Sequence, residues 1–198
     1  MVQFFKDKHE CVPYTFVMPS IDEWLQCEET GEPFSHCIHC KLPLVEIANL
    51  WLVNKDYHRG ECVLEYSICK TCRDDLTEQL SEESKKAVRD FLESEIDWPA
   101  RSQEFMLIHD EAERFSSCIA CRKKRELCEG FAISALYDAA GNLITGPLPL
   151  LICHDCSGQM KALLSEQSRE VWKRFLTDHF DGPPNGEFDI SEGGFGII

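Results

Sequence analysis

Basic side chains are scarce in this sequence. Its 198 residues include 20 Lys and Arg against 35 Asp and Glu, which gives a formal net charge of -15. Because proteins bind nucleic acids largely by neutralising phosphates, this shortage disfavours a nucleic acid as the main partner. A charge of this size steers association with oppositely charged surfaces. The sequence therefore predicts a partner protein with a basic surface.

The chain also lacks long hydrophobic runs. No apolar stretch approaches the roughly 18 residues that cross a bilayer, so we expect no membrane association. The opening MVQFFKDKHE breaks into charge too early to resemble a secretory leader. We therefore expect a cytoplasmic protein whose thiols stay reduced. A secreted disulfide framework is the weaker alternative for its 12 cysteines.

Cysteine, in contrast, is abundant and arranged in pairs. Residues 34–40 read FSHCIHC and residues 68–72 read ICKTC, so two Cys-x-x-Cys pairs flank a segment with hairpin character. Four thiolates brought together in this way form the tetrahedral sulfur cage that structural Zn²⁺ prefers. The predicted ligands of this first site are Cys37, Cys40, Cys69 and Cys72.

The same arrangement occurs a second time. FSSCIAC at residues 115–121 follows the first knuckle by 81 residues, and ICHDC at residues 152–156 follows ICKTC by 84. We interpret this as an internal duplication, with the extra length absorbed by a longer hairpin loop. Each repeat has a complete set of thiols, which favours ligation within a repeat over cross-braced ligation between repeats. The predicted ligands of the second site are Cys118, Cys121, Cys153 and Cys156.

The order of Cys-x-x-Cys knuckle, hairpin, and Cys-x-x-Cys running into a helix resembles the treble-clef class of zinc modules. The resemblance covers residues 34–96 and 115–180. It implies that the last cysteine pair lies in the first turn of a helix, whose dipole favours thiolate charge. It specifies metal binding without specifying one family, because the class includes nucleic-acid binders, nucleases and interaction domains. Two structural Zn²⁺ ions are expected, and iron is less favoured because the second pair enters a helix.

Two hairpins are predicted from the distribution of apolar and turn-forming residues. The first has strands at residues 44–53 and 62–68 around a turn with Asn54, Asp56 and Gly60. The second has strands at residues 131–137 and 143–152 around the turn DAAGN. Pro147 and Pro149 cannot donate to a ladder, so the last strand is expected to be an edge or partly irregular.

Each repeat should end in an amphipathic helix. Ser81 and Ser165 suit the N-cap position, and large apolar residues recur at helical spacing after each of them. We expect these apolar stripes to be core, and they could pack on each other and fuse the copies. A shorter helix start is indicated at Ser20, with a comparable stretch at residues 99–106.

The sequence thus predicts an α+β fold built from two small zinc-stapled repeats, either as two modules or as one pseudo-symmetric body. The predicted divisions are an N-terminal lead-in at residues 1–16, zinc module 1 at 17–97, zinc module 2 at 98–180 and a Gly/Pro-rich tail at 181–198.

Four cysteines have no counterpart in the other repeat and are expected to be small buried hydrophobes. They are Cys11, Cys27, Cys62 and Cys128. A third metal site formed by His9, Cys11 and Cys27 is the less favoured alternative. His36, His39 and His154 lie beside predicted ligands and are expected to face solvent, although His154 could tune or replace a ligand.

Four cysteines close each metal site, so we expect no catalysis and a role as an acidic protein-protein interaction module. A first alternative is a nucleic-acid-associated factor that contacts phosphate through the basic cluster Arg122, Lys123, Lys124 and Arg125. A second alternative is a metal-dependent hydrolase or nuclease. His58 is the only hairpin histidine that could serve a nuclease, and the second repeat has no matching residue.

Overall fold

A single antiparallel sheet forms the centre of the protein, which we describe from a computed structural model covering residues 20–181. The sheet order is β2-β1-β3-β4, and β5 also pairs with β3. Six α-helices and three short 3-10 helices complete the described residues, so the α+β prediction is confirmed. The strands are β1 (Trp51–His58), β2 (Glu61–Cys69), β3 (Gly130–Tyr137), β4 (Leu143–Ile144) and β5 (Leu150–Cys153).

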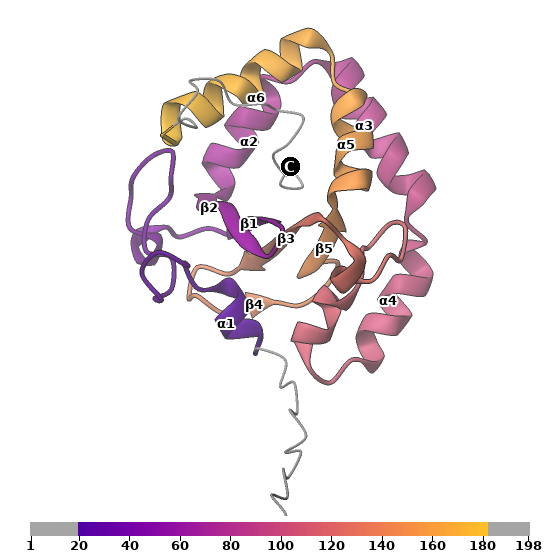
Figure 1. Ribbon diagram of the computed structural model, residues 1–198. Helices are drawn as coiled ribbons and strands as arrows, with labels where there is room; N and C mark the ends of the chain where they lie inside the picture. Colours follow the sequence, from indigo (N-terminus) through magenta and orange to yellow (C-terminus); the bar gives the residue numbers. More distant parts are fainter. Residues whose placement is uncertain (1–19, 182–198) are drawn as a thin grey trace, which may run out of the picture.

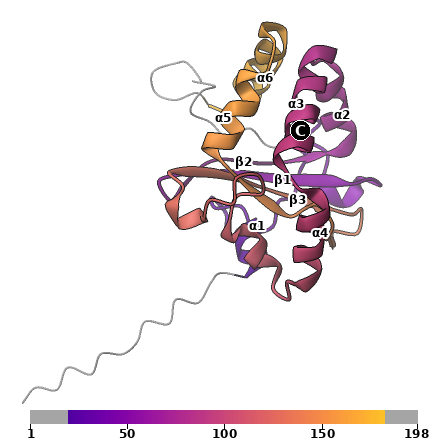
Figure 2. The same ribbon diagram turned by 90° about the vertical axis from the view of Figure 1, so that its right-hand side faces the viewer.

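Helices lie on both sides of this sheet. Figure 2 shows the sheet nearly edge-on, with α2, α3, α5 and α6 rising from one face and α1 below the other. None of the helices within residues 20–181 has the length and apolar character that crossing a membrane requires. The α-helices are α1 (Ile21–Leu25), α2 (Lys70–Glu78), α3 (Glu82–Glu95), α4 (Trp98–Leu107), α5 (His154–Ala162) and α6 (Glu166–His179). The 3-10 helices are η1 (Leu44–Glu46), η2 (Glu111–Ser116) and η3 (Arg125–Leu127).

The first hairpin differs from its predicted boundaries. Residues 44–46 form η1, and β1 begins only at Trp51. Asn54 and Asp56, predicted in the turn, are buried inside β1. The turn instead lies at Arg59 and Gly60, whose φ angles of 51° and 86° suit a tight two-residue connection. The turn prediction was wrong because both polar side chains have partners within the fold, which outweighs their local turn propensity.

The second hairpin follows its prediction more closely. Asp138 accepts hydrogen bonds from the N–H groups of Ala140 (2.9 Å) and Asn142 (2.8 Å), which closes the predicted turn. The following strand is interrupted: β4 and β5 are separate strands, and Pro147 and Pro149 lie between them. The expected irregularity at these prolines is confirmed.

Ser81 and Ser165 are the N-caps of α3 and α6, as predicted. Their hydroxyls accept hydrogen bonds from the N–H groups of Ser84 (3.2 Å) and Ser168 (3.3 Å). The stripe on α6 is core, with Trp172 and three other apolar residues buried. In the corresponding stripe of α3, Val88, Phe91 and Leu92 are half-buried, and Ile96 just beyond the helix is buried. Hydrogen bonds between the two cap regions join α3 and α6.

The two halves of the chain, residues 20–97 and 98–181, contain the same order of elements and share the sheet. In each half a 3-10 helix is followed by an antiparallel hairpin and then by two helices. β1 pairs with β3, so Val53 lies opposite Ala135 and Asn54 opposite Ser134. With the offset of 81 residues, exchanging the halves maps these pairs onto each other. The β1–β3 register is therefore symmetric about an approximate twofold axis, and the sheet crosses the predicted boundary at residue 97.

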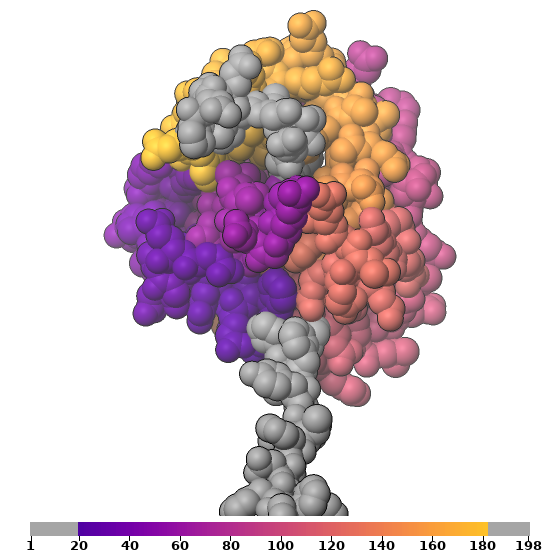
Figure 3. All heavy atoms as spheres, viewed as in Figure 1, coloured from indigo at the N-terminus to yellow at the C-terminus, as the bar shows by residue number. Residues whose placement is uncertain are grey.

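The last helix within residues 20–181, α6, crosses to the first half. Phe175 on α6 packs edge-on against Tyr66 of β2, with ring centroids 5.5 Å apart. His179 at the end of α6 lies 3.0 Å from His39, measured between ring nitrogens. In Figure 3 the yellow end of α6 lies against the indigo and purple surface of the first half. Figure 1 shows α3 running down the opposite side toward α4, beside the second half. Each half therefore contributes a helical segment to the other.

Candidate metal centres

The structure brings the eight predicted cysteines into two clusters. In each cluster the four Sγ atoms lie within 4.8 Å of one another, and the group could hold a metal ion. Four Zn–S bonds of about 2.3 Å in a tetrahedron would place the sulfurs about 3.8 Å apart. The clusters are Cys37, Cys40, Cys69 and Cys72 in the first metal centre, and Cys118, Cys121, Cys153 and Cys156 in the second. This is the sequential grouping, not the cross-braced one.

A tight knuckle positions the first cysteine pair of each centre. The Cys37 N–H donates to the carbonyl of Leu42 (3.0 Å), and the Lys41 N–H donates back to the carbonyl of Cys37 (2.9 Å). Lys41 closes this turn with a φ of 62°. In the second centre Arg122 takes the same place with a φ of 65°. Both knuckles thus place a long side chain in the left-handed region, which favours glycine.

The sheet fixes the position of each knuckle. The Ile38 N–H donates to the carbonyl of Ser67 on β2 (2.8 Å), and the Ile119 N–H donates to the carbonyl of Leu151 on β5 (2.7 Å). The sulfurs of Cys37 and Cys118 also accept hydrogen bonds, each at 3.4 Å, from the N–H groups of Cys69 and Cys153. Backbone groups of the strands thus help to position the thiols of each site.

The second cysteine pair of each centre lies at a helix N-terminus. Cys69 is the N-cap of α2, and its sulfur accepts a hydrogen bond from the Cys72 N–H at 3.5 Å. Cys153 is the N-cap residue of α5, although its sulfur makes no capping hydrogen bond. The positive end of a helix dipole stabilises negative charge. Both helices therefore favour the thiolate form that ligates metal.

In each cluster one buried cysteine has a lowered pKa, whereas two others have a raised pKa. The hydrogen bond with Cys153 and nearby backbone N–H groups lower the pKa of Cys118 to about 5, against the effect of burial. Burial and the neighbouring Cys118 raise the pKa of Cys156 to about 12. In the first centre burial raises the pKa of Cys72, whereas N–H donors outweigh burial and lower that of Cys37. A bound cation would replace the remaining thiol protons, which is the behaviour of a thiolate metal site.

Arg101 supports the second centre in a way that the sequence did not indicate. This buried side chain donates to the carbonyls of Cys118 (2.7 Å) and Ile119 (3.2 Å). It also pairs with Glu104, which in turn binds Arg122. Arg101 lies on α4, outside both motifs, and Ser20 occupies the matching position of the first half. No repeat signal could have revealed it.

His154 does not face solvent as expected. Its Nε2 lies 2.6 Å from Oδ1 of Asp56, and its side chain is largely buried. Burial raises the pKa of Asp56 overall, although His154 acts in the opposite direction. The imidazole also lies directly over Gly130, where an added Cβ would come within 2.1 Å of Nδ1. The expectation was wrong because the pairing of β1 with β3 places Asp56 beneath the first turn of α5.

The other histidines in the described part of the chain form no further cluster of metal ligands. His58 at the end of β1 stacks on His154 with centroids 5.9 Å apart. His36 and His39 are exposed, as expected, although His39 contacts His179. Within residues 20–181, only the two four-cysteine clusters meet the geometric requirement for a metal site. The third site proposed for His9, Cys11 and Cys27 lies partly outside the described residues.

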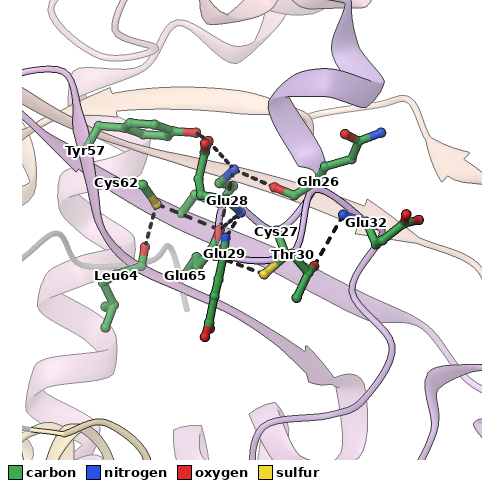
Figure 4. Close-up of polar contacts among 11 residues, drawn as sticks. Gln26, Cys27, Glu28, Glu29, Thr30, Glu32, Tyr57, Cys62, Leu64 and Glu65 are labelled. Carbon is green, nitrogen blue, oxygen red and sulfur yellow. Dashed lines mark hydrogen bonds and ion pairs between the residues drawn. The ribbon is translucent and has the colours of Figure 1, made fainter.

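Cys27 and Cys62 contact a polar cluster around Lys55, and Cys62 also packs against the edge of the apolar core. The Lys55 ammonium is fully buried and contacts Glu28 (2.7 Å), the carbonyl of Gln26 (2.6 Å) and Glu65 (3.5 Å). Cys27 donates to Glu65 at 3.1 Å, and Figure 4 shows both thiols directed toward this carboxylate. Burial raises the pKa of the Cys62 thiol to about 12, so it stays protonated. Both cysteines are half-buried, as is Cys128, so the expected buried positions are only partly met.

Most side chains of the basic cluster at residues 122–125 pair with other residues of the same chain. Arg122 pairs with Glu104 (2.5 Å), and Lys123 pairs with Asp155 (2.8 Å). The Arg125 guanidinium lies 4.7 Å from the ring of Trp24. Three of its four cations therefore have partners, which reduces the charge available for phosphate.

The donor set of each centre is specific for a thiophilic metal. Eleven cysteines lie within the described residues, and none of them forms a disulfide. Both clusters are thus compatible with zinc-binding modules. No protein-family model matches the chain, and neither a curated protein nor a solved structure matches it significantly.

Proposed function

We propose that the protein is a non-catalytic zinc protein, made of two treble-clef-like modules fused by duplication, that binds a partner with a basic surface. The observation that carries the zinc assignment is the pair of closed four-sulfur clusters. Zn²⁺ has no geometric preference from d-electrons and accepts four thiolates in a tetrahedron. Iron is less favoured because the second pair of each cluster begins a helix instead of a second knuckle.

Catalysis at these centres is disfavoured by their coordination. A catalytic zinc keeps an open position for water, whereas four cysteines fill the coordination sphere. The pair Asp56 and His154 lies nearby, but its buried carboxylate is used to hold the first turn of α5. The hydrolase alternative is therefore less favoured.

Duplication is supported by contacts that recur under exchange of the halves. The knuckle hydrogen bonds, the strand pairing across the axis and the serine caps each occur as matched pairs. Such repetition of detail is expected if one ancestral module was copied and its helices then packed on the neighbouring copy.

The free cysteines fit a reducing compartment such as the cytoplasm.

The binding role rests on charge. The formal charge of -15 disfavours phosphate backbones and favours basic surfaces. The nucleic-acid alternative depends on residues 122–125, and the engagement of Arg122, Lys123 and Arg125 weakens it. A basic protein is therefore the partner that we propose.

Elemental analysis of the purified full chain tests the metal assignment, with two zinc ions per chain as the expected result. Iron, or a folded metal-free protein, would contradict it. The binding role is tested with fluorescein-labelled basic, neutral and acidic decapeptides at low ionic strength. Only the basic set should bind, and its affinity should fall with added salt. Failure of every basic peptide to bind would remove the proposed role.

A further inference from the structure

A groove of about 1120 Å³ opens on the sheet face opposite α2, α3, α5 and α6. Apolar side chains of the first half form much of its lining. The indole of Trp51 stacks on Tyr137 with centroids 4.2 Å apart, and Val53 lies on the same face of β1. Val45 in η1 also lines the groove and is 89% exposed. A side chain this apolar and this open is a candidate contact for another molecule.

The second half shows how the chain covers the corresponding place. Phe115 is the counterpart of Phe34, by the offset of 81 residues. The Trp24 ring lies 6.1 Å from Phe115, and Phe115 is completely buried. Phe34 is only half-buried and lines the groove. An aromatic side chain therefore fills the second half at a place that remains open in the first.

Asp22 lines the groove, and four more acidic residues adjoin lining residues in the sequence. The lining residues and their immediate neighbours in sequence include five Asp or Glu residues and no Lys or Arg. These five residues, which we call the acidic rim, are Asp22, Glu23, Glu32, Glu46 and Asp138. An apolar groove with such a rim complements a segment that combines an apolar anchor with flanking positive charge.

We propose that this groove is the docking site for a partner-protein segment with an aromatic or large aliphatic side chain flanked by Lys or Arg. The anchor contacts Val45, Trp51 and Phe34, and the flanking cations face the acidic rim. This inference rests on the proposed function, since it locates the surface on which the basic partner binds. Burial of the anchor supplies affinity, and the rim supplies orientation and salt dependence.

The test uses the full, zinc-loaded chain and fluorescein-labelled octapeptides in fluorescence anisotropy. One peptide has the sequence Lys-Arg-Gly-Trp-Leu-Gly-Lys-Arg. The second has Ala-Ala in place of Trp-Leu. The Trp-Leu peptide should bind about tenfold more tightly, because burial of its apolar surface is worth more than 1.4 kcal/mol.

Two variants probe the groove itself. Val45→Asn should raise the Kd of the Trp-Leu peptide about tenfold and leave that of the Ala-Ala peptide nearly unchanged. Glu46→Lys should raise both Kd values and reduce their salt dependence. The matched controls are Val63→Asn, at a 53% exposed valine on β2, and Glu83→Lys, at an exposed position on α3. Neither control should change binding.

The outcomes separate this inference from the proposed function. Basic peptides could bind with a Kd that changes neither when Ala-Ala replaces Trp-Leu nor in the Val45→Asn variant. That result overturns the groove assignment, and the proposed function stands. If no basic peptide binds at all, both fail. Self-association that Val45→Asn abolishes, measured by sedimentation, would assign the groove to a second copy instead. An approximately tenfold tighter Kd in a folded variant lacking residues 1–19 would assign it to that segment and also overturn the proposal.

Discussion

The hydroxyl oxygens of Ser81 and Ser165 lie 2.9 Å apart, close to the approximate twofold axis. Each serine caps its own helix and also meets the helix of the other half. The Ser81 N–H donates to Ser168 Oγ (3.0 Å), and the Ser165 N–H donates to Ser84 Oγ (2.8 Å). Ser84 and Ser168 are completely buried. Four small hydroxyls thus satisfy one another at the place where α3 and α6 begin.

Removing one of these hydroxyls should leave a buried donor without its partner. Ser84→Ala is expected to lower the free energy of unfolding by about 1–3 kcal/mol, because the Ser165 N–H then lacks an acceptor. Ser168→Ala should have a similar effect through Ser81, and the double variant should deviate from additivity. Urea denaturation measures these differences. Ser94→Ala, at an exposed serine of α3, is the control and should change stability by less than about 0.5 kcal/mol.

Loss of one metal centre should weaken both halves. Cys118→Ser is expected to reduce the metal content from two ions to one, as measured by native mass spectrometry. Hydrogen exchange should then quicken in β2 as well as in β5, because Phe175 of the second half covers Tyr66 of the first. Cys128→Ser is the matched control, since Cys128 lies near the centre but outside its cluster. A change confined to the second half would contradict the crossed arrangement.

Lys55 should be among the most sensitive positions outside the metal centres. Lys55→Met removes a buried cation and leaves Glu28 and Glu65 without their shared partner. Breaking such a pair by removing one member costs about 3–5 kcal/mol. Lys86→Met removes an exposed pair with Asp90 and should cost about 1 kcal/mol or less. Equal losses for the two variants in thermal or urea unfolding would show that the Lys55 cluster contributes little.

The same cluster predicts a dependence on pH. The hydrogen bond from Lys55 lowers the pKa of Glu28 below its usual value. Between the folded and unfolded pKa values of Glu28, the folded state therefore binds fewer protons than the unfolded state. The stabilisation is fully present above the unfolded pKa. It is lost as the pH falls through the folded pKa. The difference in stability between the wild type and Glu28→Gln should be largest near neutral pH and shrink in acid. A difference that grows on acidification would reverse the expected sign.

The knuckle turns offer a test of backbone strain. Lys41 has a φ of 62°, a conformation that costs a non-glycine residue about 1–2 kcal/mol. Lys41→Gly should therefore keep or raise the unfolding midpoint, since the side chain is exposed and the backbone strain is relieved. Lys41→Val should lower the midpoint, because a β-branched residue tolerates this region poorly. If both variants behaved alike, strain at the knuckle would be negligible.

The centres were accessible from the sequence because their signal is local. Cys37 and Cys40, for example, lie three positions apart, and the spacing alone predicts a turn that brings their sulfurs together. Ser81 and Ser165 were found in the same way, since an N-cap is defined by its own helix. The turn at residues 138–142 likewise depends on side chains within five consecutive positions.

What was missed depends on contacts between distant residues. Asn54 looks like a turn residue, yet it accepts a hydrogen bond from Ser134 in the neighbouring strand at 2.7 Å. Lys55 resembles a surface lysine until residues 26–28 fold over it. Arg101 binds carbonyls in a knuckle 17 and 18 residues away, with no motif to indicate it. Such partners become visible only once the topology is known.

The crossing of α6 sets an order of events during synthesis. His39 leaves the ribosome 140 residues before His179, the residue that finally lies beside it. The first knuckle and its strands can therefore capture a metal long before their covering helix has been translated. Until then, His39 beside the first knuckle and Tyr66 on β2 both lack the partners that α6 supplies.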